Sequence, residues 1–197
     1  MTFLTQNDFV KMEWNEYQNN IEKIYQDLNN FLEKNNLNID YIVPVFRGGG
    51  IPAISLSYLL RTHKIISIQL KHDYKNKNID IVSNSLSEIK EPEKPYTLLL
   101  VDGYHASGRT SYMAYDLIKN YLPNSSIIYV TLGRDVGYLE NKRDFLFSCH
   151  AFLSNECGVI PKEESIKKGV LTKYTLFPWE ILEDELQNMN DEIKYGA

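Results

Sequence analysis

The chain has 197 residues, enough for one domain with a full α/β core, and its 43% hydrophobic and 24% charged residues are ordinary globular values. A formal net charge of −5 provides no basic surface for nucleic acid or an anionic membrane, so neither is expected as a partner. No apolar segment approaches a membrane span, and residues 1–10 lack the features of a signal peptide. Two cysteines suit a reducing compartment, so we predict a cytoplasmic protein. A structural role for Cys149 and His150 is favoured over zinc binding.

The first elements along the chain are a helix, a buried strand and a second helix. Apolar residues recur at helical spacing over 14–33, which predicts a helix with one core-facing stripe. A short apolar run at 41–46 predicts a strand buried on both faces. Residues 51–60 predict a helix with Pro52 in its first turn.

A second strand is predicted at 64–70, and a polar stretch follows it. Residues 71–94 are charged and contain few core residues. They predict a long excursion with at most a small hairpin near 79–82.

Three further strands, at 96–102, 126–132 and 145–152, and a helix at 110–121 are predicted in the second half. Strands that alternate with helices predict an α/β fold, a doubly wound, mainly parallel, five-stranded sheet. We expect a single domain over residues 1–197.

The loops that carry chemistry all follow predicted strands. They are residues 47–50, 102–110 and 133–137. Binding sites in parallel sheets lie beyond the carboxyl ends of the strands, so these loops are expected to meet. Residues 173–180 close the domain before a polar C-terminal helix.

The segment 98–111 is the most informative one. A buried strand runs into Asp102, a tight Ser107-Gly108 turn follows, and a helix opens with Thr110 in its first turn. Unpaired N–H groups at a helix N-terminus bind phosphate, and a carboxylate upstream can hold ribose hydroxyls or Mg²⁺. The segment therefore suits a sugar phosphate. An ordinary strand–turn–helix junction would also contain Gly and a capping hydroxyl.

A second candidate anion site is Arg47 followed by Gly48, Gly49 and Gly50 on a strand-to-helix turn. Glycine permits close approach of the backbone, so N–H groups can line a concave pocket beside the Arg. The alternative is a flexible turn that happens to contain an Arg.

In these two motifs the chain resembles the type I phosphoribosyltransferases, specifically the xanthine-guanine (6-oxopurine) enzymes. Residues 43–49 match the family's strand that ends in Arg-Gly-Gly, and 101–110 align without gaps with its motif for phosphoribosyl pyrophosphate (PRPP). Tyr174 precedes the Pro-Trp-acid triplet 178–180 at the family's distance. The resemblance spans nearly the whole chain in the right order.

The resemblance implies transfer of the phosphoribosyl group of PRPP to a nucleobase, with release of pyrophosphate. It implies that Arg47, Gly48 and Gly49 contact pyrophosphate, in a loop that holds a cis non-proline peptide in related enzymes. Asp102 would hold the ribose hydroxyls directly or through Mg²⁺, the implied cofactor, and Asp102 and Arg47 are the expected catalytic residues. The 5′-phosphate would be bound by Ala106, Ser107, Gly108, Arg109 and Thr110.

The base would be bound by three further residues. Tyr174 would stack on a purine face beside Thr175, and Arg134 stands where the family has a Lys that donates to the 6-oxo group. A surface salt bridge is the alternative for Arg134, and Trp179 is expected in the core.

The resemblance also implies moving and covering segments. Residues 71–95 resemble the mobile loop of the family, and lysines there could face the departing pyrophosphate, unless they simply belong to a solvated loop. Residues 153–180 and the C-terminal helix would form a hood. The insertion at 154–168 within it either covers the pocket or only decorates the surface. Family members form homodimers or homotetramers, so self-association is expected.

Two positions depart from the family pattern. The second acid of the PRPP motif is Gly103, and the acid assigned to acid–base work is Ala106. Uracil phosphoribosyltransferases also lack the second acid and place Ala before Thr-Gly. His105 could substitute, but neighbouring residues usually point to opposite sides. Besides a 6-oxopurine enzyme, a catalytically degenerate sensor of PRPP or a nucleotide, or a transferase for a non-standard base, therefore remains open.

Overall fold

A computed structural model describes residues 3–89 and 94–195, and its centre is a six-stranded sheet. The strands are β2 (Tyr41–Phe46), β3 (Ile68–Asp73), β4 (Asn78–Asn84), β5 (Thr97–His105), β6 (Ser126–Asp135) and β7 (Phe147–Ser154), in the order β4-β3-β2-β5-β6-β7. All run parallel except β4, which is antiparallel to β3. The predicted doubly wound α/β fold is confirmed, with a sixth strand added.

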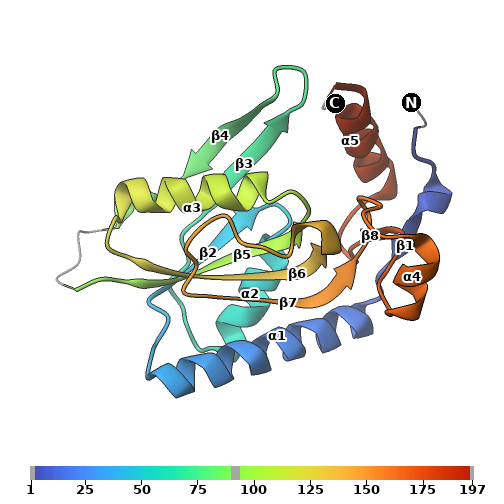
Figure 1. Cartoon of the computed structure of the whole chain (residues 1–197). Helices are drawn as coiled ribbons and strands as arrows, with labels where there is room; N and C mark the ends of the chain where they lie inside the picture. Colours follow the sequence, from blue (N-terminus) through green and yellow to red (C-terminus); the bar gives the residue numbers. More distant parts are fainter. Residues whose placement is uncertain (1–2, 90–93, 196–197) are drawn as a thin grey trace.

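Helices cover both faces of this sheet (Figure 1). The described helices are α1 (Trp14–Asn35), α2 (Gly50–Leu59), α3 (Arg109–Tyr121), α4 (Lys162–Lys167) and α5 (Leu182–Tyr195), with single 3-10 turns at Gln6–Asp8, Leu86–Glu88 and Val136–Tyr138. α1 and α2 pack on one face through a cluster that includes Leu28, Leu56 and Val101, and α3 packs on the other through Ile118 and Leu100. In the described part of the chain, no helix is both long and apolar enough to cross a membrane.

The predicted long excursion after the second strand is a β-hairpin instead. β3 begins at Ile68, four residues later than predicted, and its pairing with β4 runs from Ile68↔Asn84 to Asp73↔Asn78. In β4 only Ile79 is buried, so its apolar pattern gave a weak strand signal. Residues 90–93 of the expected mobile loop lie outside the described residues.

A small second sheet joins the two ends of the chain. β1 (Phe9–Lys11) pairs in parallel with β8 (Tyr174–Leu176), and the N–H of Met12 donates to the carbonyl oxygen of Leu176 (2.8 Å). This pairing fixes the segment that carries Tyr174, and the sequence analysis did not predict it. The expected hood contains α4 and β8, while its status as part of one domain remains a prediction.

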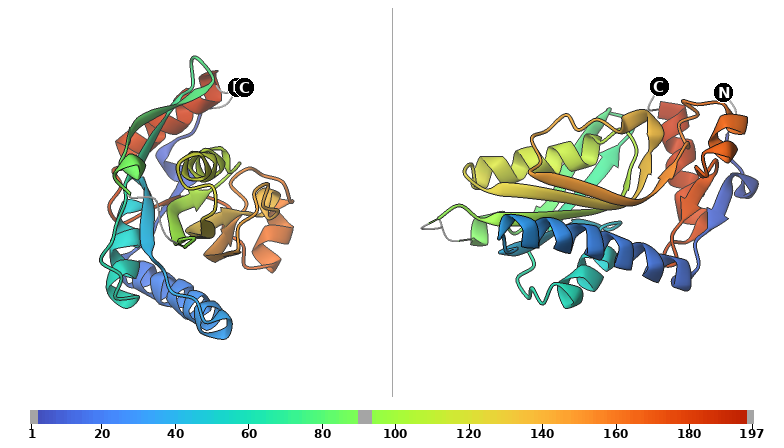
Figure 2. Two further views of the ribbon diagram at one scale, coloured as in Figure 1. Left: turned by 90° about the vertical axis from the view of Figure 1, so that its left-hand side faces the viewer. Right: turned by 60° about the horizontal axis from the view of Figure 1, so that its bottom comes forward.

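α5 lies beside the β3–β4 hairpin, as the two views of Figure 2 show. A groove of about 660 Å³ between them is lined by hairpin residues such as His72 and by α5 residues such as Glu192. None of the side chains of α5 is buried. The predicted polar helix therefore forms one wall of a groove and contributes no buried side chain to a hydrophobic core.

The turn from β2 into α2 packs directly on the backbone of β5. The N–H of Gly49 donates to the carbonyl oxygen of Val45 (2.9 Å), which makes the turn tight. A Cβ at Gly49 would lie 2.1 Å from the carbonyl oxygen of Val101, whereas a Cβ at Gly48 would meet nothing closer than 3.6 Å. Only a residue without a side chain fits at position 49.

We therefore expect Gly49→Ala to destabilise the fold strongly. The added methyl group must push two adjacent strand ends apart, at a cost of about 3 kcal/mol or more in the free energy of unfolding. Urea unfolding measures this cost, and Gly48→Ala is the matched control with a cost well below it. Equal stability of the two variants would contradict the close approach.

Candidate active site at the strand ends

The candidate site lies where the neighbouring strands β2 and β5 reach their carboxyl ends. A cavity of about 380 Å³ opens there, between the strand ends, the segment after β8 and the first turns of α5. Its lining includes Arg47, Gly48, Asp102, Tyr104, Trp179 and Glu180. The structure thus brings together the two expected catalytic residues, Arg47 and Asp102, which are 55 positions apart in the sequence (102 − 47).

Asp102 is a buried carboxylate at the rim of β5. Only 9% of its surface is exposed, and its Oδ1 accepts the N–H of Gly103 (2.8 Å). Burial raises the pKa of Asp102 from the ordinary 3.8 to about 7, although the Gly103 hydrogen bond opposes this rise. A strongly shifted acid in a cavity is typical of a functional site.

The turn that carries Arg47 touches the end of β5. The peptide bond between Phe46 and Arg47 is cis, as the family resemblance implies. A Cβ placed on Gly48 would lie 3.7 Å from Oδ1 of Asp102, so the two turns are in contact. Gly48, next to Arg47, therefore lies against the carboxylate on the side of β2.

The predicted phosphate-binding turn leads into α3 as expected. The N-cap of α3 is Gly108, and the first backbone hydrogen bond of the helix runs from the N–H of Tyr112 to the carbonyl of Gly108 (2.9 Å). The N–H groups before Tyr112 therefore point toward the turn. Arg109 is exposed beside them, whereas Ala106, Ser107 and Thr110 are partly buried.

His105 faces α3 and not the cavity. Its ring lies between Tyr112 and Tyr129, and Nδ1 is within hydrogen-bonding distance of the Tyr129 hydroxyl (3.1 Å) and of Ser111 Oγ (3.2 Å). Burial lowers the pKa of His105 to about 4, helped by the charge of Arg134, so the ring is neutral at pH 7. The geometry does not favour His105 as a substitute for the missing acid.

Arg134 does not reach the cavity in this arrangement. Its Nε donates to the carbonyl oxygen of Tyr138 (2.9 Å), and its terminal nitrogen donates to Oδ1 of Asn141 (2.9 Å). The side chain is 4% exposed. Its assignment to the base stays a prediction, and base contact would require that these two hydrogen bonds be exchanged.

Tyr174 and Thr175 lie in β8, beyond the other end of the cavity. The ring of Tyr174 packs against Phe9 with a centroid distance of 5.7 Å. The N–H of Thr175 donates to Oε1 of Glu156 (3.2 Å), and its buried hydroxyl has no hydrogen-bond partner among the described residues. Trp179 stacks on Phe177 and packs against the core while also lining the cavity, so its predicted core position is only partly correct.

Tyr104 links the cavity to the hood, a role that sequence reasoning missed. Its hydroxyl hydrogen-bonds with Ser154 Oγ and lies beside Glu156. Burial raises the pKa of Glu156 to about 8. No sequence motif marks Glu156, because the segment 154–168 has no counterpart in the resemblance.

α5 and the turn before it bring carboxylates to the cations of the site, which the sequence analysis also missed. Glu180 and Glu185 line the cavity with Arg47. Burial raises the pKa of Glu180 to about 7, and the charge of Arg47 opposes that rise. Partial removal from water also raises the pKa of the half-buried Glu185, against the charge of Arg47, and the pKa of the more exposed Glu192, against the charge of Arg109. The only earlier signal was the acidic composition of the predicted helix.

Comparison with known proteins supports this architecture. No family model matches the sequence, and no curated protein matches it either. Solved structures do match. A purine phosphoribosyltransferase from Pyrococcus horikoshii superposes with a TM-score of 0.63 at 19% identity, over 88% of this chain and 95% of that one. The chain has the type I phosphoribosyltransferase fold.

Two further structures are similar along most of their length. The xanthine-guanine-hypoxanthine phosphoribosyltransferase of Helicobacter pylori has a TM-score of 0.59 at 13% identity, over 91% of this chain and 99% of that one. A hypothetical protein from Neisseria gonorrhoeae with bound ppGpp has a TM-score of 0.66 at 15% identity, over 94% and 97% of the two chains. The sheet and the helices packed on it therefore share the arrangement of these structures over most of both chains.

The raised pKa of Asp102 leads to a prediction on stability. In the unfolded chain Asp102 loses its proton near pH 4, whereas in the folded chain it keeps the proton up to about pH 7. The folded state therefore loses stability as pH rises between these values, because the unfolded state releases its proton first. Asp102→Asn removes this loss. The variant should match the wild type near pH 4 and exceed it by about 1–3 kcal/mol near pH 8 in urea unfolding.

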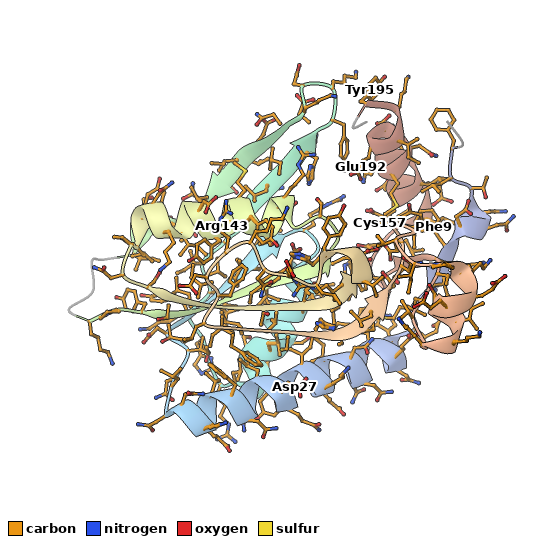
Figure 3. The ribbon with its side chains drawn as sticks, viewed as in Figure 1. Phe9, Asp27, Arg143, Cys157, Glu192 and Tyr195 are labelled. Carbon is orange, nitrogen blue, oxygen red and sulfur yellow. The ribbon has the colours of Figure 1, made fainter. Side chains whose placement is uncertain are left out.

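Asp27→Asn, on the exposed side of α1, is the control for this comparison, because Asp27 does not line the cavity. Figure 3 labels Asp27 on α1. Its stability should differ little from the wild type at either pH. If Asp102→Asn were less stable than the wild type near pH 8, the burial argument for Asp102 would be wrong.

Proposed function

We propose that the protein transfers the phosphoribosyl group of PRPP to a nucleobase, most readily a 6-oxopurine. A ring nitrogen of the base bonds to C1′ of the ribose, the bond between C1′ and pyrophosphate breaks, and the nitrogen loses its proton. The single observation that carries the proposal is the shared cavity of Arg47 and Asp102 on a phosphoribosyltransferase fold. The fold supports the reaction class, and the two neighbours named for purines support the choice of base.

Each part of PRPP has a proposed partner in the strand-end loops. The turn 106–110 and the N-terminus of α3 hold the 5′-phosphate through N–H groups and hydroxyls. Asp102 accepts hydrogen bonds from the hydroxyls of the ribose, and Arg47, Gly48 and Gly49 contact pyrophosphate. These contacts orient C1′ toward the base and stabilise the leaving group, which are the main needs of a transition state with oxocarbenium character.

Magnesium fits this site as a companion of the substrate. In the part of the chain that the structure describes, no three His, Cys, Asp or Glu side chains are grouped to hold a metal ion. Of the carboxylates that line the cavity, Asp102 is the one at a strand end, whereas Glu180, Asp184 and Glu185 come from the segment after β8 and from α5. Mg²⁺ is commonly held by one carboxylate and by substrate phosphates, so Asp102 is its proposed protein ligand. When bound with PRPP, Mg²⁺ would neutralise charge on the departing pyrophosphate.

The base is proposed to enter between Tyr104 and the hood. Tyr174 supplies an aromatic face, Thr175 supplies a buried hydroxyl that lacks a partner, and Arg134 supplies donors once its hydrogen bonds to the 138–141 loop are exchanged. Tyr104 and Glu156 have no equivalent in the purine motif. They favour the variant of this proposal in which the substrate is a modified purine or another base.

A second function, a regulatory protein that binds PRPP or a nucleotide without turnover, is favoured by two observations. Gly103 and Ala106 replace the two acids of the motif. One similar structure carries bound ppGpp, a guanine nucleotide with two phosphate groups at each end of its ribose. Gly103 and Ala106 lie in the loop proposed to bind PRPP, and both functions would use that loop, so ligand binding alone does not separate them.

Pyrophosphate release separates them. The protein is mixed with Mg²⁺, PRPP and, in turn, guanine, xanthine, hypoxanthine, adenine and uracil. We expect release that requires both PRPP and a 6-oxopurine and that stops when EDTA removes Mg²⁺. Asp102→Ala should lower kcat/KM about hundredfold through lost positioning, with Asp27→Ala as the unaffected control. Arg134→Ala should mainly change the ranking of bases.

The contrary outcomes are distinct. Turnover only with another base would correct the substrate class. PRPP or ppGpp binding in calorimetry without turnover of any base would favour the regulatory protein. Full activity in Asp102→Ala would contradict the placement of the PRPP motif.

Self-association through α2 is also proposed. α2 follows the Arg-Gly-Gly turn, and its outer side exposes Ile54, Tyr58 and Leu59, with Tyr58 80% exposed. A contiguous apolar surface of this kind is typical of an interface. We expect a homodimer or homotetramer by light scattering and a lower mass for Tyr58→Asp. Tyr121→Asp, on the opposite side of the sheet, is the control, and a monomeric wild type would exclude the proposal.

A further inference from the structure

We propose that His72, carried by the β3–β4 hairpin, is a direct ligand of the 5′-phosphate. The inference rests on the proposed sugar-phosphate site and adds a residue to it from outside the PRPP motif. It also gives the hairpin a defined task, since the hairpin would bring an imidazole to the first turn of α3.

The position of His72 carries the proposal. Its Nε2 lies 2.8 Å from Oγ1 of Thr110, the hydroxyl that we assign to the 5′-phosphate. Its ring stacks on Tyr74 with a centroid distance of 5.2 Å and an interplanar angle of 6°. Strand alternation puts His72 on the same side of β3 as the buried Leu70, so the ring points toward α3. A phosphate that hydrogen-bonds to Thr110 would therefore lie within reach of His72.

The charges around His72 come from four segments, which are α3, α5, β3 itself and the turn after β2. Arg109 lies on α3, next to Thr110. Glu192 of α5 lies beside the hydroxyl of Tyr74, and Figure 3 labels it on the part of α5 next to the hairpin. The groove that contains His72 is also lined by Lys71, Arg47, Asp184 and Glu185.

Burial and the charge of Arg109 favour the neutral ring of His72 in the free protein. Burial lowers the pKa of His72 below its usual 6.5, and the charge of Arg109 lowers it further. A phosphate dianion beside Nε2 reverses this balance, because an adjacent opposite charge favours the protonated ring. His72 then donates a charge-assisted hydrogen bond to the phosphate, while Thr110 donates its hydroxyl proton to another phosphate oxygen. Binding of the phosphate therefore takes up a proton at His72.

His72→Gln tests this coupling with little change in shape. The Gln amide can still hydrogen-bond with Thr110, but it cannot become positively charged. The probe is ribose 5-phosphate, which carries the 5′-phosphate and lacks pyrophosphate. Calorimetry gives its affinity for the wild type and the variant near pH 6 and near pH 8, and the ratio of the two affinities cancels the titration of the ligand itself.

We expect the wild type to bind about tenfold more tightly than His72→Gln near pH 6, which is the usual strength of a charged hydrogen bond, and about equally near pH 8. The NMR titration of the His72 ring should move to higher pH when ribose 5-phosphate is present. His63→Gln, an exposed histidine in the loop before β3, is the matched control and should follow the wild type at both pH values.

Either of two results would overturn the inference, and the second would also overturn the proposed function. If ribose 5-phosphate binds and moves the amide signals of Gly108 and Thr110, but the affinity ratio stays near one at both pH values, the sugar-phosphate site is right and His72 is not its ligand. If neither PRPP nor ribose 5-phosphate moves those signals, the proposed function fails and the inference fails with it.

Discussion

The contact between the end of β2 and the end of β5 is the constraint on which the site depends. A Cβ at Gly49 would overlap the carbonyl oxygen of Val101, and a Cβ at Gly103 would lie 3.0 Å from the carbonyl oxygen of Gly48. The two turns therefore approach as closely as two backbones can. This approach brings Arg47 and Asp102 into one cavity, and it leaves very little room for a side chain at position 103. The family motif has an acid at this position. Here the backbone of Gly48 occupies the space that the side chain of such an acid would need.

The electrostatics of the site follow from burial. Asp102, Glu180 and Glu156 all have a raised pKa, and burial is the first cause in each case. Removal of carboxylates from water is unfavourable unless they are paired. The charge of Arg47 opposes the rise in the pKa of Glu180 and Glu185, and the charge of Arg109 opposes that of Glu192. Both arginines are expected to bind phosphate. A phosphate ligand must therefore compete with the carboxylates of α5 for the same arginines. Because α5 buries none of its side chains, few contacts oppose its displacement from that position.

Much of the fold and half of the site could be predicted from the sequence, for physical reasons. Strands β2, β5 and β6 are buried on both faces, so they appear as continuous apolar runs, and the glycine and acid at their ends mark the loops. β4 exposes all but one of its apolar residues. A strand at the edge of a sheet does not need a continuous apolar run, so the sequence marks β4 weakly. α5 was predicted as a helix, but its place against the hairpin depends on polar contacts between segments over a hundred residues apart. Composition contains no such information.

For the same reason, the sequence predicts the phosphate-binding part of the candidate site better than its base-binding part. Phosphate binding uses backbone N–H groups, whose direction follows from the strand, the turn and the first helical turn of α3. Base recognition uses side chains from separate segments, and here those side chains have other partners: Arg134 binds the 138–141 loop, and Tyr104 binds Ser154. Ala106 offers no acid to the base, and the neutral ring of His105 faces α3. Phosphoribosyl transfer as proposed for this site would therefore depend on how firmly the sugar phosphate and the leaving pyrophosphate are held, because neither Ala106 nor His105 can move the proton of the base.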